Sequence, residues 1–127
     1  MPLARISHTS GKSDTHIEAL SQGVHQALIS AFEIPEDDYF QILTEHAAGR
    51  DIKCPDSFLG IDHGEDVVFV QITSAEGRTT EQKRALFSAI AGNLEKNAGI
   101  PCQDVIINII ETKRENWSFG NGIASFA

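Results

Sequence analysis

The second residue of the chain, Pro2, offers the most distinctive chemistry in the sequence, which opens with MPLARI. Aminopeptidases generally remove methionine before a proline, and loss of Met1 would leave Pro2 with a free secondary amine. An α-amino group titrates at about 7.7–8.0 in model peptides; burial lowers that pKa and a nearby carboxylate raises it. Such a nitrogen can serve as a general acid, a general base or a nucleophile toward a carbonyl.

No familiar catalytic motif accompanies Pro2. The HExxH, G-x-S-x-G, P-loop and GxGxxG patterns are all missing, and the five histidines show no metal-ligand spacing. Cys54 and Cys102 stand alone, which indicates reduced thiols rather than a disulfide frame. We interpret DHGED (62–66) as a polar turn and His25 as a structural residue.

The bulk properties indicate a single domain over residues 1–127, because this length suits one hydrophobic core. The net charge of −8 argues against a duplex nucleic acid partner, which would need a basic surface. No apolar run approaches the length of a membrane span, and no secretory signal precedes the first strand. We therefore expect a cytoplasmic protein.

The chain contains an internal repeat, seen when it is shifted by 66 positions so that Pro35 falls on Pro101 and Asp38 on Asp104. Ile6, Gly11, Ala19, Leu20, Leu28, Ile34 and Glu45 also fall on identical residues. One supersecondary unit is therefore used twice, over about 3–46 and about 66–111.

Each unit reads as strand, helix and strand. The strands are predicted over 3–8 and 39–46 in the first unit and over 66–74 and 104–110 in the second. The helices are predicted to begin at the capping residues Ser13 and Thr79, and each has one apolar face. Strand, helix and strand at this length indicate parallel pairing with a right-handed crossover. The predicted fold is α/β (α+β), a four-stranded mixed sheet with both helices on one face.

Two strands carry nearly continuous apolar runs, VVFV (67–70) and VIINII (105–110), which is typical of strands buried on both faces. Two helices can cover only one face of a sheet, so we expect other copies of the chain to cover the second face.

Two segments fall outside the repeat. Residues 47–65 form a connection that is long enough to be functional or well packed. The tail over 116–127 contains the only tryptophan, two phenylalanines and two glycines. It is interpreted either as a hairpin-like segment that packs on the body or a neighbour, or as the aromatic wall of a pocket.

Pro2 at the start of such a repeat resembles the tautomerase superfamily. Within it, the segments IPEDDYFQI, TSAEGRTTEQK and NWSFGNG resemble the malonate semialdehyde decarboxylase group, and the resemblance covers essentially the whole chain. It implies a homotrimer with its active site around the N-terminal proline. It also implies chemistry on small 2-oxo or 3-oxo acids without a metal or an organic cofactor.

The resemblance assigns roles to individual residues. The catalytic amine maps to Pro2, the acidic residue to Asp38, the carboxylate-binding arginine to Arg78, and the aromatic wall to Trp117, Phe119 and Phe126. For Asp38 a purely structural role in the turn stays open, because Asp104 occupies the same place in the second unit. Lys12 and Arg78 both precede a helix, where the helix dipole disfavours a cation, so Arg78 is expected to meet an anion.

The sequence departs from the decarboxylase pattern in one place, since Ala75, Glu76 and Gly77 stand where a further basic residue is expected. Three hypotheses follow. The first is a cofactor-free decarboxylase of a 3-oxo acid such as malonate semialdehyde, and the second is a keto-enol tautomerase of 2-oxo acids such as phenylpyruvate. The third is a non-catalytic trimeric binding protein, which applies if Met1 is retained, because Pro2 would then be an amide without basicity.

Overall fold

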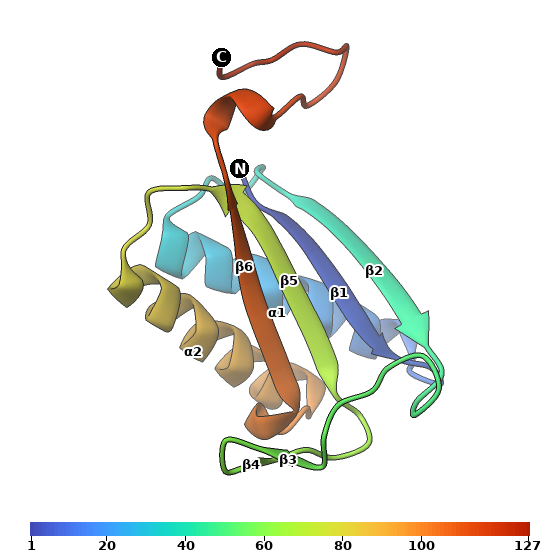
Figure 1. Ribbon diagram of the computed structural model, residues 1–127. Coiled ribbons are helices and arrows are strands. Elements are labelled where there is room, and N and C mark those ends of the chain that lie inside the picture. The colour runs from blue at the N-terminus through green and yellow to red at the C-terminus, as the bar shows by residue number, and fades with distance from the viewer.

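Four strands form one mixed sheet in the order β2-β1-β5-β6: β1 (Leu3–Thr9), β2 (Phe40–His46), β5 (Val68–Ala75) and β6 (Val105–Thr112). β1 and β2 pair in parallel, as do β5 and β6, and the central pair β1–β5 is antiparallel. The helices α1 (Asp14–Phe32) and α2 (Thr80–Ala98) cover one face (Figure 1). The computed structural model describes residues 1–127 and confirms the predicted fold of two β-α-β units.

Both helices begin at the predicted capping residues. The Ser13 side chain accepts a hydrogen bond from the His16 backbone N–H, while Thr79 and Gln82 form a reciprocal capping box. At the other end, the residues after the helices, Glu33 (φ 55°) and Gly99 (φ 68°), adopt the left-handed conformation. This geometry suits Gly99, whereas it costs about 1–2 kcal/mol at Glu33, which has a Cβ atom.

The hydrophobic core lies between the helices and the sheet. Its largest fully buried side chains are Ile6, Leu20, Val24, Val68, Val70, Ile72, Leu86, Ile90 and Leu94. The helices touch closely at Gly23, where an added Cβ would lie 2.8 Å from Leu94 Cδ2. Asn93 Nδ2 donates to the Gly23 carbonyl at 3.0 Å across the same contact. Gly23 therefore lets α1 and α2 approach closely, and a larger residue there would require the Leu94 side chain to move.

The opposite face of the sheet is uncovered in the single chain and carries apolar side chains among polar ones such as Arg5, Gln71 and Asn108. Side chains alternate along a strand, so this face carries Leu3, Phe40, Ile42, Phe69, Ile106 and Ile110. Phe40, Ile42 and Ile110 are 40–46% exposed. The apolar runs predicted to be buried on both faces thus lack a cover on one of them.

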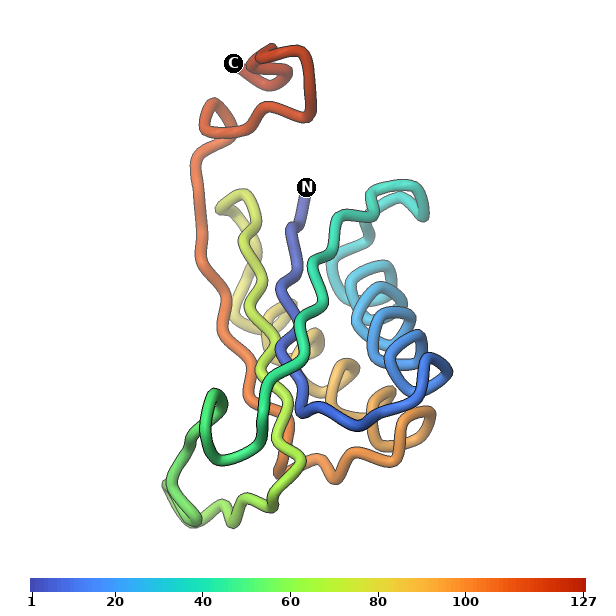
Figure 2. Tube along the Cα trace, turned by 90° about the vertical axis from the view of Figure 1, so that its right-hand side faces the viewer, coloured from blue at the N-terminus to red at the C-terminus, as the bar shows by residue number.

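The two segments outside the repeat take forms that the sequence did not predict. The 47–65 connection contains a small hairpin of β3 (Ser57–Phe58) and β4 (Ile61–Asp62). The tail forms no hairpin: after the short 3-10 helix η2 (Arg114–Asn116) it continues in turns beyond the end of the sheet (Figure 2). A second 3-10 helix, η1 (Cys102–Asp104), precedes β6. Neither α1 nor α2 could cross a membrane.

Candidate functional site

The strand register brings Pro2, Asp38 and Arg78 to one end of the sheet. Leu3 pairs with Phe40 of β2 and with Thr73 of β5. The residues before Leu3 therefore lie between the turn that leads into β2, which carries Asp38, and the loop that follows β5, which carries Arg78. Pro2 itself is buried.

Asp38 holds the start of the chain. The ammonium group of Met1 donates a hydrogen bond to Asp38 Oδ2, and the two groups form an ion pair. Standard bond lengths place the Pro2 nitrogen about 3–4 Å from the Met1 nitrogen. An amine on Pro2 would therefore have the Asp38 carboxylate as its near neighbour.

Arg78 is half-buried and has no acidic partner among the ion pairs of the structure. Its Nη1 donates to the Ala75 carbonyl at 3.3 Å, and its Cζ lies 4.8 Å from the centre of the Phe32 ring. Stacking of a guanidinium on an aromatic ring contributes about 0.5–2 kcal/mol and fixes its orientation. The remaining N–H groups can bind an anion.

The tail brings its aromatic residues to the same end of the sheet. Trp117 and Phe119 stack with ring centres 5.4 Å apart, Phe126 meets Phe119 edge-on at 5.9 Å, and Phe119 lies 5.2 Å from Phe40. Trp117 Nε1 donates to Thr112 Oγ1 at 2.7 Å, which ties the tail to the end of β6. The three predicted wall residues thus form one cluster that reaches the strand following Asp38.

Three contacts of this region were not predicted from the sequence: Phe32 under Arg78, Phe40 against Phe119, and Thr112 as the acceptor for Trp117. Phe32 and Phe40 fit the apolar pattern of their own elements, so nothing in the sequence separates them from ordinary core residues. The partners are distant in sequence, and only the strand order brings them together.

At the opposite end of the sheet, the second unit places an aspartate and a cation in the same way, but these two groups have different partners. Asp104, the counterpart of Asp38, accepts a hydrogen bond from the Gly64 backbone N–H at 2.6 Å. Lys12, the counterpart of Arg78, pairs with Asp66 at 3.1 Å, and Thr9 Oγ1 also donates to Asp66 at 3.0 Å. The hydrogen bond from Lys12 is the main cause that lowers the pKa of Asp66 below its usual value. The chain itself therefore satisfies both groups at this end.

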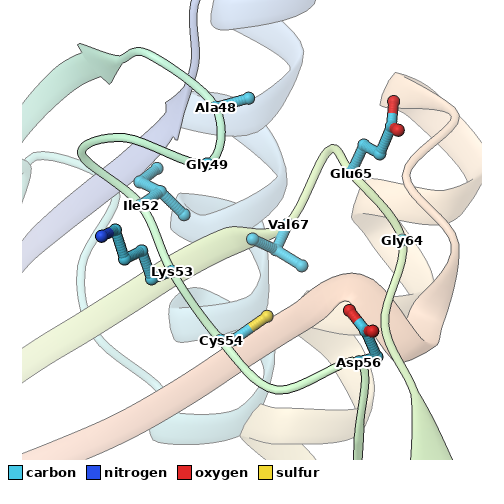
Figure 3. Close-up of a pocket in the computed structure, with 9 residues that line it drawn as sticks. All are labelled: Ala48, Gly49, Ile52, Lys53, Cys54, Asp56, Gly64, Glu65 and Val67. Atoms are coloured by element: carbon cyan, nitrogen blue, oxygen red, sulfur yellow. The ribbon is translucent and has the colours of Figure 1, made fainter.

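The principal surface hollows also lie away from Pro2. One, of about 620 Å³, opens beside the far end between the 47–54 segment and the approach to β5 (Figure 3). Its lining residues are Ala48, Gly49, Ile52, Lys53, Cys54, Asp56, Gly64, Glu65 and Val67. Neither this hollow nor four others on the surface are lined by Pro2, Asp38 or Arg78. No group of three or more His, Cys, Asp or Glu residues is placed to hold a metal ion.

Comparison with known proteins gives a consistent result. A family model described as "Tautomerase enzyme" matches residues 38–120. The Bacillus subtilis (strain 168) protein named "Probable tautomerase YusQ" is 35% identical over 124 residues, which are 98% of this chain and 97% of that protein.

Solved structures agree with the sequence matches. The crystal structure of FG41 malonate semialdehyde decarboxylase inhibited by 3-bromopropiolate is 38% identical, with a TM-score of 0.91 over 98% of this chain and 93% of that one. A fused 4-OT described as a symmetric trimer shares the fold at 23% identity, with a TM-score of 0.78 over 95% and 94% of the two chains. The family match over most of the chain and the full-length relatives show that the protein belongs to the tautomerase superfamily of enzymes, in the group similar to malonate semialdehyde decarboxylase.

Proposed function

We propose that the protein is a cofactor-free decarboxylase of a small 3-oxo acid such as malonate semialdehyde, with the Pro2 amine as its central group after loss of Met1. The observation that carries this proposal is the position of Asp38, which forms an ion pair with the ammonium of Met1, the residue next to Pro2, at the same end of the sheet as an arginine without an acidic partner. The 38% identity to a solved malonate semialdehyde decarboxylase supports it.

In the proposed reaction, Arg78 binds the substrate carboxylate and orients the bond that breaks. Loss of carbon dioxide leaves the bonding electron pair on C2, which gives an enolate whose negative charge develops on the carbonyl oxygen. In one route, protonated Pro2 stabilises that oxygen by hydrogen bonding, and a proton that adds to C2 gives the aldehyde. In the other, Pro2 first loses its proton and its lone pair attacks the carbonyl carbon to form an iminium with release of water. Loss of carbon dioxide then leaves an enamine, which takes up a proton at C2, and water hydrolyses the resulting iminium to the aldehyde and free Pro2.

The charge of the amine decides between this reaction and its nearest alternative. A carboxylate beside an amine favours the charged form, so Asp38 supports a protonated Pro2. Trp117 and Phe119 would exclude water from the site, which strengthens the electrostatic stabilisation and favours loss of the substrate's charge as carbon dioxide.

A keto-enol tautomerase acting on 2-oxo acids such as phenylpyruvate is the second candidate. Two observations favour it: the curated relative is named a tautomerase, and the loop over Ala75, Glu76 and Gly77 holds no second cation. This reaction needs a neutral Pro2 that can accept a proton. The pKa of the amine therefore separates the two functions, being above neutrality for the decarboxylase and at or below it for the tautomerase.

A direct assay tests the proposal. Protein whose mass shows that Met1 is absent is expected to release carbon dioxide from malonate semialdehyde with a higher kcat/KM than it shows for ketonisation of phenylpyruvate enol. Carbon dioxide release and loss of enol absorbance are measured on the same preparation. A higher kcat/KM for phenylpyruvate would favour the tautomerase, and no turnover of either would contradict both.

We also propose that the protein is a homotrimer whose uncovered sheet faces bury one another. Sedimentation at micromolar concentration is expected to give three chains. Ile42→Glu is expected to shift the protein toward smaller species, because it places a charge among the exposed apolar side chains of this face. Ser88→Glu, which adds the same charge on the exposed side of α2, serves as the control. A stable monomer in the unmodified protein would contradict this assembly.

A further inference from the structure

The turn that carries Asp38 is fastened to α1 by a polar cluster, which consists of Ser21, His25, Tyr39 and Gln41. Ser21, in the middle of α1, is 4% exposed. Its hydroxyl lies 2.5 Å from the Tyr39 hydroxyl and donates to Gln41 Oε1 at 2.6 Å. Since serine has one hydroxyl proton and it goes to Gln41, the Tyr39 hydroxyl is the donor to Ser21. Gln41 Nε2 returns a hydrogen bond to the Ser21 carbonyl at 3.0 Å.

His25 makes the second attachment of the polar cluster. It lies one turn further along α1 and is 7% exposed. Its Nε2 lies 2.9 Å from the Glu36 carbonyl, and Nε2 must be the donor because a carbonyl oxygen only accepts. The imidazole also meets the Tyr39 ring edge-on, with ring centres 4.5 Å apart. The residues on both sides of Asp38 are therefore fixed to the helix.

The second unit of the repeat shows that the fold does not need this cluster. Sixty-six positions further on, Ser21, His25, Tyr39 and Gln41 are replaced by Phe87, Ala91, Val105 and Ile107. The two turns share one backbone hydrogen bond, because the Asp104 N–H donates to Pro101 O at 2.9 Å as the Asp38 N–H does to Pro35 O at 3.1 Å, although the second turn continues as the 3-10 helix η1. The second turn is fastened to α2 by other contacts, in which the Cys102 N–H donates to Glu95 Oε2 at 3.0 Å and Cys102 Sγ donates to the Ala91 carbonyl at 3.7 Å. This turn and its aspartate are therefore built without a cluster of the Ser21 type.

The two turns differ in what their aspartates hold. Asp104 accepts from the amide of Gly64, which does not titrate, whereas Asp38 pairs with the Met1 ammonium and would have the Pro2 amine beside it once Met1 is removed. The energy of an ion pair depends on the distance between its charges, so the position of Asp38 affects the charge of the amine. The position of Asp104 has no such effect on an amide.

We propose that Ser21, His25 and Tyr39 are positioning residues, which hold the Asp38 turn on α1 so that its carboxylate stays beside the terminal amine. This inference rests on the proposed function in that it takes Pro2 as the reacting amine. A loosened turn would let Asp38 move toward water, and the pKa of the amine would fall. The other charged residues on the elements that meet at this end of the sheet are Glu33, Glu36, Asp37, Glu76, Arg78, Glu81, Lys83, Arg84, Glu111, Lys113, Arg114 and Glu115.

The test uses Ser21→Ala and Tyr39→Phe in the full-length protein with Pro2 at its N-terminus. The first removes the shared hydroxyl, and the second removes only the phenol oxygen and keeps the ring against His25. Thr44→Val is the matched control, since it removes a side-chain hydrogen bond to His46 on the same strand but outside the polar cluster. The pKa of Pro2 is measured by NMR with ¹⁵N-labelled proline, and kcat and KM are measured on malonate semialdehyde.

We expect both variants to lower the pKa of the Pro2 amine by about one unit. We also expect them to lower kcat by about tenfold while KM changes little, because Arg78 is untouched. Thr44→Val should leave the pKa and kcat unchanged. Equal pKa values in the variants and the unmodified protein would overturn the positioning role. Because the NMR measurement needs no turnover, it still decides this point if the proposed reaction itself is not found.

Discussion

A protein in which Pro2 stays acylated is expected to lose about 10²–10⁴-fold in kcat/KM for malonate semialdehyde, the usual contribution of a positioned acid or base. The change is insertion of leucine between Met1 and Pro2, because a large second residue prevents removal of the methionine. The Pro2 nitrogen then remains a tertiary amide, which has no basic lone pair and cannot form an iminium. Intact mass confirms the extension, and steady-state kinetics measure the loss.

Pro2→Ala provides the graded comparison. Loss of Met1 then leaves a primary amine with a freer conformation, which forms an iminium less readily, so activity should fall between those of the unmodified and the extended proteins. Sedimentation of all three checks that the assembly is the same. Full activity in the extended protein would show that the nitrogen takes no part. A borohydride-trapped adduct at Pro2 would select the iminium route over simple protonation.

Arg78→Ala is expected to lower kcat/KM on carboxylate substrates by about ten- to a hundredfold, since a hydrogen bond to a charged group contributes about 1.5–3 kcal/mol. The folded state should lose little, because Arg78 makes only a stacking contact with Phe32 and one hydrogen bond. Kinetics and thermal unfolding are measured on the same samples. Arg78→Lys should give an intermediate value, because it keeps the charge but loses the planar fork.

Lys12→Ala is the matched control for Arg78→Ala. It removes a cation from the same position of the other unit, where Asp66 already holds it. It should therefore leave kcat/KM unchanged, although it breaks an ion pair. Equal losses in the two variants would mean that Arg78 is not a carboxylate anchor and that both substitutions act through the fold.

The fold could be predicted from the sequence because each unit contains residues that mark where its helix and its turn begin. Ser13 and Thr79 mark the helix starts, Pro35 and Pro101 mark the turns, and the repeat limits how the strands can pair. The placement of Asp38 beside the chain start follows from the same logic, since a parallel β1–β2 pair brings those two points together. The uncovered apolar face also followed from counting the faces that two helices can cover.

Other features could not be predicted, because they depend on contacts between residues far apart in sequence. The tail contains turn-forming residues, and Asn121 adopts a φ of 56° between two glycines, so no strand pairing develops. The contact between Phe119 and Phe40 depends on the position of the folded tail relative to β2. The place of His25 on its helix predicts a structural role, but its hydrogen bond to the Glu36 carbonyl forms only when the turn folds onto α1 and does not follow from the sequence pattern.

The unequal ends of the sheet show how chain connectivity limits the number of reactive amines. In any polypeptide that contains both units, Val68, the counterpart of Pro2, lies inside the chain, so its nitrogen is an amide. Joining two units therefore halves the number of backbone amines that the same two scaffolds would have as separate chains. The connecting segment lies where a chain start before Val68 would lie. Its Gly64 N–H donates to Asp104, and its Asp66 pairs with Lys12. A cut in the backbone just before Val68 would create a second chain start at the far end of the sheet.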